Sequence, residues 1–389
     1  MNHLYSPYEQ ELIQLRRYLH QHPEVGFELA STHEYVKNKL QSYHIHHIER
    51  AGQYSMIATL FNGDGPVIGL RADMDALPMQ EQNTHEYCSL HGGKMHACGH
   101  DAHTSMLLTA GKFLMEHLHL WSGTVKLVFQ EAEEGPDPGG AYGIVQSGLV
   151  DDVECFFGLH VSPMHPSGVI AIKSGEAMAS ADTISIRLFG KGTHAAYPHQ
   201  GIDLALLQAD IVKSFQQIVS RLISPVDHAV VTIAKIQLGT AHNIIAESAL
   251  LEGTVRTFSN SMRDFIEAKM NQILQGLCMA YGANYEFDYI RTYDPTINTP
   301  QVVNYLKKMV EEQLGIDRFQ EILKPSMGAE DFSRYIIHRQ GAIAWLGTSR
   351  NDETSFALHH PKFNIDESAM LTGVQALTQF VIHYQEATK

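Results

Sequence analysis

One short segment, residues 95–103, holds a dense set of side chains that bind metal ions well. Within it, Cys98 and His100 are separated by Gly99, and thiolate and imidazole are ligands that zinc and other late first-row metals accept. Glycine permits a backbone conformation that other residues resist, which suits a tight ligand loop. A free cysteine is more often a small buried hydrophobe. The interpretation as a metal centre therefore depends on partners elsewhere in the chain.

Such partners occur at three further places. Glu133 and Glu134 directly follow an apolar run and precede a segment rich in glycine and proline, which does not suit the exposed face of a helix. Two adjacent carboxylates can divide the work at a metal site, because one binds the ion while the other acts as general base for an attacking water. His160 follows another apolar run, and His359 lies near the C-terminus before a proline. Together these residues favour a metal-dependent hydrolytic site.

The elements that must position these residues alternate between helical and strand-like patterns. Apolar residues at spacings of three and four predict amphipathic helices over residues 12–19 and 106–114. Apolar runs predict buried strands at residues 67–70, 125–129, 156–159 and 342–346. This alternation indicates an α/β fold with a mostly parallel sheet that is covered on both faces. Ligands bind at the carboxyl ends of such strands, where residues 71–78, Glu133 and His160 come next.

The stretch from residue 178 to residue 292 has a different pattern. Its order of strand, helix, strand, strand, helix and strand is that of a ferredoxin-like split unit. The expected strands are residues 183–189, 230–238, 249–258 and 285–289, and the expected helices are residues 204–222 and 262–281. We therefore expect a discontinuous metal-binding catalytic domain of residues 1–177 and 293–389, with an α+β domain of residues 178–292 inserted into it.

The composition argues against several classes of partner and location. The 389 residues include 28 Lys and Arg against 43 Asp and Glu, which gives a formal net charge of −15. Nucleic acids and anionic membranes attract clustered positive charge, so neither is an expected partner. No run of apolar residues is long enough to span a membrane, and the first residues lack the apolar core of a signal peptide. Four cysteines are too few for a disulfide scaffold, so we expect a cytoplasmic protein.

Several sequence strings occur in a fixed order along almost the whole chain. They are LRADMDALP, MHACGHDAH, EAEEG, GLHV, GKGTHAAYPHQGID, NII, GTVRTF, MGAEDFS and LHHPKF. This set resembles the M20 metallopeptidase family, in particular its amidohydrolase branch, which includes hippurate hydrolase, N-acyl-L-amino-acid amidohydrolase and auxin-conjugate hydrolase. The resemblance implies a zinc-peptidase-like catalytic domain with a mostly parallel central sheet. It also implies an inserted ferredoxin-like domain that acts as lid and dimerisation surface.

Carried over residue by residue, the resemblance implies a dinuclear metal site. Its ligands are Cys98, His100, Glu134, His160 and His359, and the Cys98 sulfur bridges the two ions. Glu133 becomes the general base. Asp75 orients a ligand from behind, which fixes an imidazole and makes it more basic. Each chain would then hold two divalent ions, zinc or manganese, with cobalt and nickel as alternatives.

In the inserted domain, the resemblance assigns three more residues. His194 matches a histidine that reaches the active site of a neighbouring subunit and stabilises the tetrahedral oxyanion. Asn243 and Arg256 match positions around the substrate carboxylate, although their residue types alone suit an ordinary turn and an ordinary surface charge equally well. The family more often has proline where this chain has Ala246, so the local loop geometry is less firmly expected. A homodimer through the inserted domain follows from the same resemblance.

These assignments predict a metal-dependent amidohydrolase of the aminoacylase or deacetylase type. Its substrate would be a small N-acyl L-amino acid, N-acetyl or similar, which is cleaved to the free amino acid and a carboxylate. A metallo-carboxypeptidase or dipeptidase with the same dinuclear site stays open, because the side chains that meet the leaving amino acid are not readable from one sequence. A cysteine hydrolase with Cys98 as nucleophile would leave the two glutamates idle. A metal-buffering protein would need no spare base such as Glu133.

Overall fold

The computed structural model describes residues 2–351 and 354–387, and the chain divides into two compact units. Unit 1 comprises Met1–Ala177, Ile297–Lys324 and Asp331–Lys389, and unit 2 comprises Met178–Thr296 and Pro325–Glu330. The sequence pattern placed residues 325–330 in the larger domain. In the structure they lie with unit 2, because the backbone N–H of Ala179 donates to the carbonyl oxygens of Ser326 and Gly328, each at 3.0 Å.

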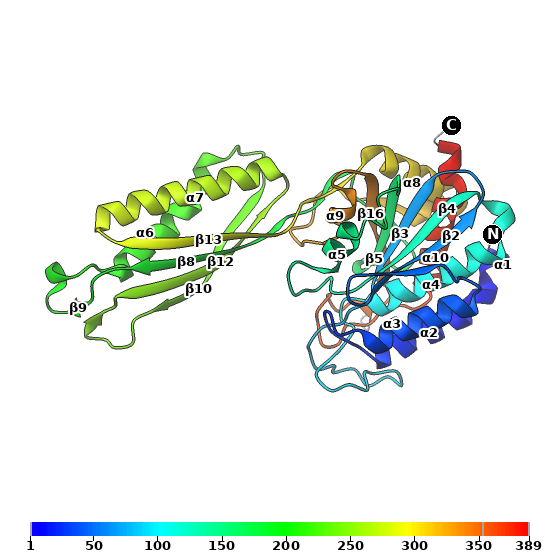
Figure 1. Ribbon diagram of the computed structural model, residues 1–389, viewed down its shortest axis with the longest axis horizontal. Coiled ribbons are helices and arrows are strands. Elements are labelled where there is room, and N and C mark those ends of the chain that lie inside the picture. The colour runs from blue at the N-terminus through cyan, green and yellow to red at the C-terminus, as the bar shows by residue number, and fades with distance from the viewer. Residues whose placement is uncertain (1, 352–353, 388–389) are drawn as a thin grey trace. The chain divides into compact units, whose positions relative to one another are not determined.

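Unit 1 is built on an eight-stranded sheet (Figure 1). Its strands are β1 (Ile48–Ala51), β2 (Ser55–Asn62), β3 (Val67–Asp73), β4 (Gly123–Gln130), β5 (Cys155–Pro166), β6 (Ile170–Ile172), β15 (Phe319–Glu321) and β16 (Gln340–Ser349). Their spatial order is β1-β2-β4-β3-β5-β16-β6-β15. The central strands β4, β3, β5 and β16 are parallel neighbours, whereas β1, β2 and β6 add antiparallel pairings. The predicted α/β class with a mostly parallel sheet is confirmed.

Helices cover both faces of this sheet. They are α1 (Asn2–Tyr5), α2 (Glu9–Gln21), α3 (Ala30–Ser42), α4 (His100–Glu116), α5 (Gly140–Gln146), α8 (Pro300–Gln313), α9 (Ser333–Ile336) and α10 (Ala369–Ala387), with short 3-10 turns at Ser6–Tyr8, Leu118–Leu120 and Ile316–Arg318. Successive strand residues point to opposite faces. Phe157 packs into the larger core with α2, α3, α4, α8 and α10, whereas Phe156 packs into the smaller core with α5 and α9.

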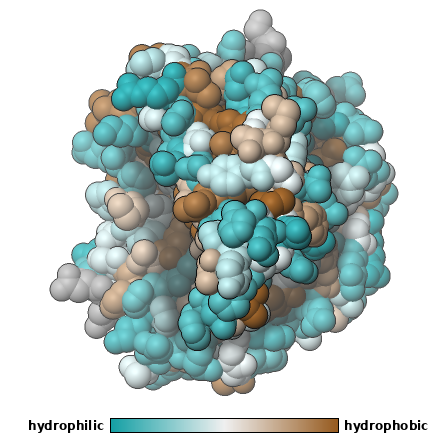
Figure 2. Space-filling model, turned by 90° about the vertical axis from the view of Figure 1, so that its left-hand side faces the viewer, coloured by the Kyte–Doolittle hydropathy of each residue, from teal (hydrophilic) through white to brown (hydrophobic). Residues whose placement is uncertain are grey.

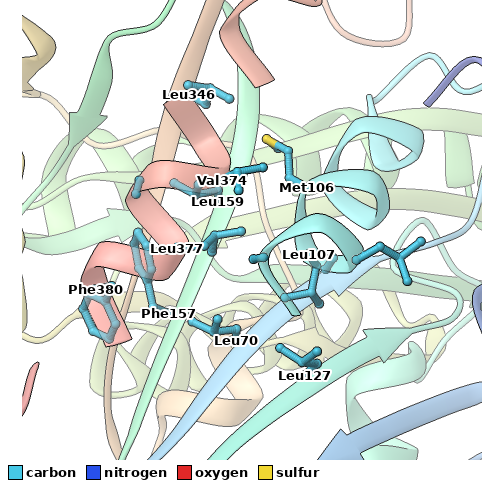
Figure 3. Packing of buried hydrophobic residues seen from close by; sticks show 14 of the residues in the cluster. Leu70, Met106, Leu107, Leu127, Phe157, Leu159, Leu346, Val374, Leu377 and Phe380 are labelled. Atoms are coloured by element: carbon cyan, nitrogen blue, oxygen red, sulfur yellow. The ribbon is translucent and has the colours of Figure 1, made fainter. Parts of the chain in front are cut away.

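The larger core joins α4 and α10 to the middle of the sheet. Figure 3 shows Leu107 of α4 and Leu377 of α10 near Leu70 and Phe157 of the strands. All four side chains are almost completely buried. Burying one such side chain contributes about 1.5–3 kcal/mol relative to exposure, so this contact holds α4 firmly against the sheet. The residues at the beginning of α4 are thereby fixed relative to the strand ends.

Unit 2 is a four-stranded antiparallel sheet with two helices on one face (Figure 1). Its main elements are β8 (Ala181–Phe189), α6 (Leu204–Gln217), β10 (Ala229–Leu238), β12 (Ser248–Thr257), α7 (Asn260–Tyr281) and β13 (Asn284–Tyr293), with a π-helical turn at Ile218–Leu222 and a 3-10 turn at Pro198–Gln200. The strand order is β10-β12-β8-β13. Alternate residues of β8, namely Ile184, Ile186 and Leu188, are buried under the helices. The predicted ferredoxin-like unit is therefore present.

Four short strands complete the chain. The chain enters unit 2 through β7 (Gly175–Met178) and leaves it through β14 (Thr296–Asn298). Within unit 2, β9 (Thr193–His194) pairs with β11 (Ile244–Ile245).

The surface seen in Figure 2 is largely hydrophilic, with smaller groups of hydrophobic residues between the polar ones. Scattered exposed apolar side chains are normal for a globular protein. Among the helices of the described residues, none combines the length and apolar character needed to cross a bilayer.

Candidate metal centre and active site

The parallel strands bring three of the predicted segments to one edge of the sheet. β3 runs parallel to β4, with Asp73 opposite Gln130 at their carboxyl ends. Asp75 follows the end of β3, and Glu133 and Glu134 follow the end of β4. The chain segments that carry these carboxylates therefore leave the sheet side by side, as expected for a ligand-binding crevice in an α/β fold.

His160 reaches the same region from inside a strand. The sequence pattern placed it just after a strand, but β5 continues to Pro166. Its pairing with β16 also continues, with His160 opposite Trp345. Polar residues at the end of an apolar run thus remain in the sheet because a neighbouring strand supplies backbone hydrogen bonds. His160 therefore lies within β5 and not in a loop after it, but it still belongs to the ligand cluster.

The Cys98–Gly99–His100 segment forms the entrance to α4. Gly99 has a φ of +88°, in the left-handed region, and α4 begins at His100. A Cβ at Gly99 would lie 2.3 Å from the Cγ2 atom of Val161. Glycine is therefore required here for both its backbone conformation and its lack of a side chain. This bears out the conformational freedom expected of the intervening glycine.

The carboxylate of Asp75 holds three parts of the site at once. Its Oδ1 atom accepts a hydrogen bond from the backbone N–H of Glu133 at 3.0 Å, and its Oδ2 atom accepts one from the backbone N–H of Glu134 at 3.0 Å. The Nδ1 atom of His100 lies 3.3 Å from Oδ1. Because an ionised carboxylate only accepts, Nδ1 of His100 is the donor and Nε2 is left to face the cluster.

The predicted ligands lie together in overlapping groups. Cys98, His100 and His160 form one group, Cys98, Glu134 and His359 form a second, and His100, Glu133 and Glu134 form a third. Within each group the ligand atoms lie within 4.8 Å of one another. The Sγ atom of Cys98 lies 3.4 Å from Nε2 of His160, and Nε2 of His359 lies 3.0 Å from Oε1 of Glu134. Cys98 belongs to two groups, which is the position that a bridging ligand would occupy.

The side chains present fit divalent cations. Among the described residues, Nε2 of His100 is buried and has no hydrogen-bond partner. His160 donates from Nδ1 to the carbonyl oxygen of Val161 at 2.8 Å, which leaves the Nε2 lone pair toward Cys98. A buried polar atom without a partner costs about 1–3 kcal/mol, and a cation would remove that cost. Imidazole, thiolate and carboxylate together are donors that zinc and its first-row neighbours accept.

The electrostatics of the cluster also favour positive charge. Burial raises the pKa of the Cys98 thiol, and the Glu134 and Glu133 carboxylates raise it further. Burial alone would lower the pKa of His100, but Asp73 and Asp75 outweigh it and raise that pKa to about 10. The carboxylates thus hold protons at positions where metal ligands must be deprotonated. Metal binding here would release protons.

Two residues beside the cluster have strained backbone conformations. Ala132, just before Glu133, has a φ of +50°, and His359 has a φ of +64°. Non-glycine residues in the left-handed region cost on the order of 1–3 kcal/mol and persist where surrounding contacts fix them. The backbone N–H of His359 donates to the carbonyl oxygen of Ala97 at 2.8 Å, which anchors this loop next to Cys98. The strain is concentrated where the proposed ligands are presented.

Asp73 is the centre of a buried hydrogen-bond network that the sequence motifs do not reveal. Asp73 accepts from Nη1 of Arg71 at 2.7 Å, and Nη2 of Arg71 donates to Asp331 at 2.8 Å. The backbone N–H of Val161 donates to Nε2 of His103 at 2.9 Å, so the His103 proton is on Nδ1 and is donated to Asp73 at 2.6 Å. The available signal was the pair of charged residues inside β3, which is buried along almost its whole length.

His194 and Asn243 are neighbours within unit 2. His194 is exposed on β9, opposite Ile244 of β11, and the backbone N–H of Ala195 donates to the carbonyl oxygen of Asn243 at 3.0 Å. His194 lines a pocket of about 520 Å³, whose other walls include Gly192, Thr240, Ile245, Glu247 and Ser248. The structure thus places two of the predicted residues of the inserted domain beside one another.

Arg256 lies on β12 of the same unit and is half-buried. Its Nη1 atom lies 3.5 Å from the carbonyl oxygen of Ser180, and burial lowers its pKa. The ligand cluster belongs to unit 1, whereas His194, Asn243 and Arg256 belong to unit 2. The roles of these three residues toward a substrate remain predictions.

Comparisons with known proteins agree with this arrangement. The sequence matches the peptidase family M20/M25/M40 over residues 69–383. It is 35% identical to N-acetylcysteine deacetylase of Bacillus subtilis, over 97% of this chain and 98% of that protein. It is also 35% identical to thermostable carboxypeptidase 2 of Saccharolobus solfataricus, over 97% of this chain and 96% of that protein.

A solved structure shows the same fold. The crystal structure of the YxeP protein of Bacillus subtilis, described as a dinuclear metal binding peptidase from the M20 family, matches with a TM-score of 0.85. The two sequences are 32% identical, and the match covers 98% of this chain and 99% of that one. Sequence and fold agree over almost the whole length, so the chain belongs to the peptidase M20/M25/M40 family and is a hydrolase.

Proposed function

We propose that the protein hydrolyses the amide bond of N-acyl L-amino acids with two divalent metal ions. The observation that carries this proposal is the overlap of two ligand groups at Cys98, with Glu133 beside them. The similarity to a protein named N-acetylcysteine deacetylase supports a small acyl group on an amino acid. The proposed products are the free amino acid and a carboxylate.

The proposed ligands are those that the structure gathers in unit 1. They are Cys98, His100, Glu134, His160 and His359, and Cys98 is the residue that two of the groups have in common, so its sulfur would be available to both ions. Zinc or manganese suits this mixed set of sulfur, nitrogen and oxygen donors, and cobalt and nickel are alternatives. When bound, the ions would polarise the scissile carbonyl and lower the pKa of the attacking water.

Glu133 is the proposed general base. Its backbone is held by Asp75, and its Oε2 atom lies 3.9 Å from Nε2 of His100, at the edge of the ligand cluster. From this position its carboxylate would take a proton from the attacking water. It would then pass the proton to the nitrogen of the leaving amine, which must be protonated before the amide bond breaks.

The inserted domain of residues 178–292 is proposed to act as lid and dimerisation surface. His194 of a neighbouring subunit would stabilise the oxyanion, and Asn243 and Arg256 would hold the substrate carboxylate. The terminal strands β10 and β13 of its sheet offer a route to a homodimer, since terminal strands present backbone groups that a second chain can pair with. The partners would then be a small-molecule substrate and a second copy of the chain.

A metallo-carboxypeptidase or dipeptidase is the second candidate. It is favoured by the 35% identity to thermostable carboxypeptidase 2 of Saccharolobus solfataricus. Both reactions cleave an amide next to a carboxylate, so the same metal ligands and base serve each. Only the group on the acyl side of the bond distinguishes them.

The direct test measures metal content and hydrolysis together. The purified protein is assayed on N-acetyl amino acids, N-benzoyl amino acids and dipeptides, before and after chelation and after restoring zinc, manganese, cobalt or nickel. We expect acyl-amino-acid cleavage that disappears with the chelator and returns with one ion. Cleavage of dipeptides alone would favour the carboxypeptidase or dipeptidase. Activity that is indifferent to chelation would instead indicate Cys98 as a nucleophile.

We also propose a cytoplasmic location. All four cysteines, each within the described part of the chain, are free, which suits a reducing compartment. Fractionation of cells that express the protein, with detection by antibody, tests this assignment.

A further inference from the structure

A second cluster of metal-binding side chains lies in unit 1, outside the ligand set described above. It consists of His20 on α2 and of Glu81 and His85 in the segment between β3 and α4. One ligand atom of each residue lies within 4.8 Å of the other two. Nε2 of His20 lies 3.2 Å from Oε1 of Glu81, and Nε2 of His85 lies 3.5 Å from the same oxygen. None of the three residues has a role in the proposed hydrolysis.

These spacings match those around a four-coordinate ion. Zinc binds imidazole nitrogen and carboxylate oxygen at about 2.0–2.2 Å, so a tetrahedral arrangement separates the ligand atoms by about 3.3–3.6 Å. The two contacts at Glu81 are close to this separation without any movement of the side chains. Two imidazoles and one carboxylate are also a common protein ligand set for zinc.

Both imidazoles are oriented by contacts at their other nitrogen. Nδ1 of His20 lies 2.7 Å from Oδ2 of Asp101. Because that carboxylate only accepts, His20 donates from Nδ1. Nδ1 of His85 lies 3.4 Å from Sγ of Cys88. In each ring, Nε2 is therefore the atom that faces Glu81, and a carboxylate behind a histidine is the usual support of a metal ligand.

Hydrogen bonds alone do not satisfy every ligand atom of this cluster. When Nε2 of His20 carries a proton, it donates a hydrogen bond to Glu81. Glu81 also accepts from Nδ2 of Asn83 at 3.0 Å and from the backbone N–H of Ser89 at 2.6 Å. Nε2 of His85, in contrast, is buried and has no hydrogen-bond partner within the described residues. A divalent cation at this point would engage all three ligand atoms at once.

We propose that His20, Glu81 and His85 form a third divalent-metal site, separate from the dinuclear centre, with zinc as the favoured ion. The site would join α2 to the segment that precedes Cys98. Asp101, which orients His20, stands in the first turn of α4 next to His100. The ion would therefore have a structural role. It would fix the position of α2 relative to the segment that leads to Cys98 and His100.

The test counts zinc bound per chain. The full-length protein is saturated with zinc, freed of unbound metal and analysed by elemental mass spectrometry alongside His85→Ala and the control His91→Ala. His91 is an exposed histidine of the same segment and is not part of the cluster. We expect His85→Ala to hold one zinc fewer per chain than the wild type, and His91→Ala to hold the same number. Equal zinc content in all three proteins would overturn the proposal.

A variant that lacks the dinuclear centre distinguishes zinc bound at this site from zinc bound at the catalytic ligands. In a Cys98→Ala/Glu134→Ala protein, the catalytic ligand set is broken, and we expect one bound zinc that is lost when His85→Ala is added. If the dinuclear centre is wrongly assigned, the difference of one zinc caused by His85→Ala still appears. If His85→Ala does not fold, as judged by circular dichroism, His85→Gln is used instead. If the parent and the folded variant bind the same amount of zinc, the proposal of the third site is overturned, and the assignment of the dinuclear centre is not affected.

Discussion

The proposed chemistry depends most directly on the carboxylate of Glu133. Replacing it by glutamine keeps the size and the backbone contact with Asp75 but removes the group that accepts a proton. We expect Glu133→Gln to retain wild-type metal content while kcat falls by roughly 10²–10⁴. Metal analysis and steady-state kinetics on the same preparation check this. A fully metallated variant that keeps more than about a tenth of its kcat would remove Glu133 from the role of base.

At the scale of single residues, the sequence shows which side chains could bind a metal ion, but it does not show which hydrogen bonds support them. Cys98 and His100 are recognisable because they stand two positions apart with glycine between them. The contact between His103 and Asp73 is not recognisable, because it joins residues that are 30 positions apart and belong to different elements. The same holds for Asp75, whose bonds to two backbone N–H groups exist only after β3 and β4 have aligned.

The loop between β4 and α5 depends on a glycine that has no room for a side chain. A Cβ at Gly140 would lie 1.7 Å from the carbonyl oxygen of Glu131, in the loop that presents Glu133 and Glu134. We expect Gly140→Ala to displace this loop, to lower stability by about 1–3 kcal/mol and to reduce metal binding. Denaturant unfolding and metal analysis measure both effects.

The matched control lies in the same helix. A Cβ at Gly143 would meet only the Cα atom of Gly52 at 3.7 Å, which is ordinary contact. Alanine inside a helix is favoured over glycine by roughly 0.5–1 kcal/mol, so Gly143→Ala should leave stability unchanged or raise it. Equal losses in both variants would show that the helix, and not the crowding at Glu131, is responsible.

Glu11 joins three helical segments and makes part of the stability depend on pH. It accepts hydrogen bonds from Nζ of Lys112 on α4 and from the hydroxyl of Tyr43 just after α3, each at 2.7 Å. Burial raises the pKa of Glu11, but these contacts outweigh burial and place the pKa below its ordinary value of 4.5. Its stabilising contribution is therefore complete above about pH 4.5 and is lost as the pH falls through the lowered pKa.

We expect Glu11→Gln to lower the free energy of unfolding by about 0.5–1.5 kcal/mol at pH 7. The difference from the wild type should shrink as the pH falls through the lowered pKa of Glu11, because the native carboxylate then becomes protonated as well. Glu34→Gln is the control, because the pair that Glu34 forms with Lys37 at 3.8 Å is exposed and its loss should change stability little. A difference between Glu11→Gln and the wild type that stays constant from neutral pH down to the acid unfolding of the protein would contradict the assignment.

The order of elements was predictable, whereas several of their ends were not. The spacing of apolar residues predicts β8, α7 and the buried strands of unit 1, because the residues that are buried in these elements must be apolar. The extension of β5 past His160 depends on pairing with β16, which is almost two hundred positions away in the chain. Residues 325–330 lie with unit 2 through backbone hydrogen bonds. Any residue type can form such bonds, so the sequence does not reveal them.

At the scale of the whole molecule, the proposed role of His194 requires two chains. His194 is exposed in unit 2, and its replacement leaves the ligand cluster of unit 1 intact. We expect His194→Ala to lower kcat by about 10²–10³ with no loss of metal, as for other oxyanion donors. When it is mixed with Glu133→Gln, part of the activity should return, since a mixed dimer holds one site with both intact groups. Demonstrably mixed dimers without activity would place His194 in its own chain's site or outside catalysis.

The proposed ligands lie far apart in the chain, from Cys98 to His359, and this has a consequence for biosynthesis. A nascent chain that has not yet placed the loop around His359 holds only part of the ligand set. Domains fold as units and metal affinity depends on a preformed site, so full loading with both ions must follow completion of unit 1. The occupancy of the dinuclear centre should therefore report the fraction of chains that have matured, and truncated or misfolded chains should be recognisable by their lower metal content.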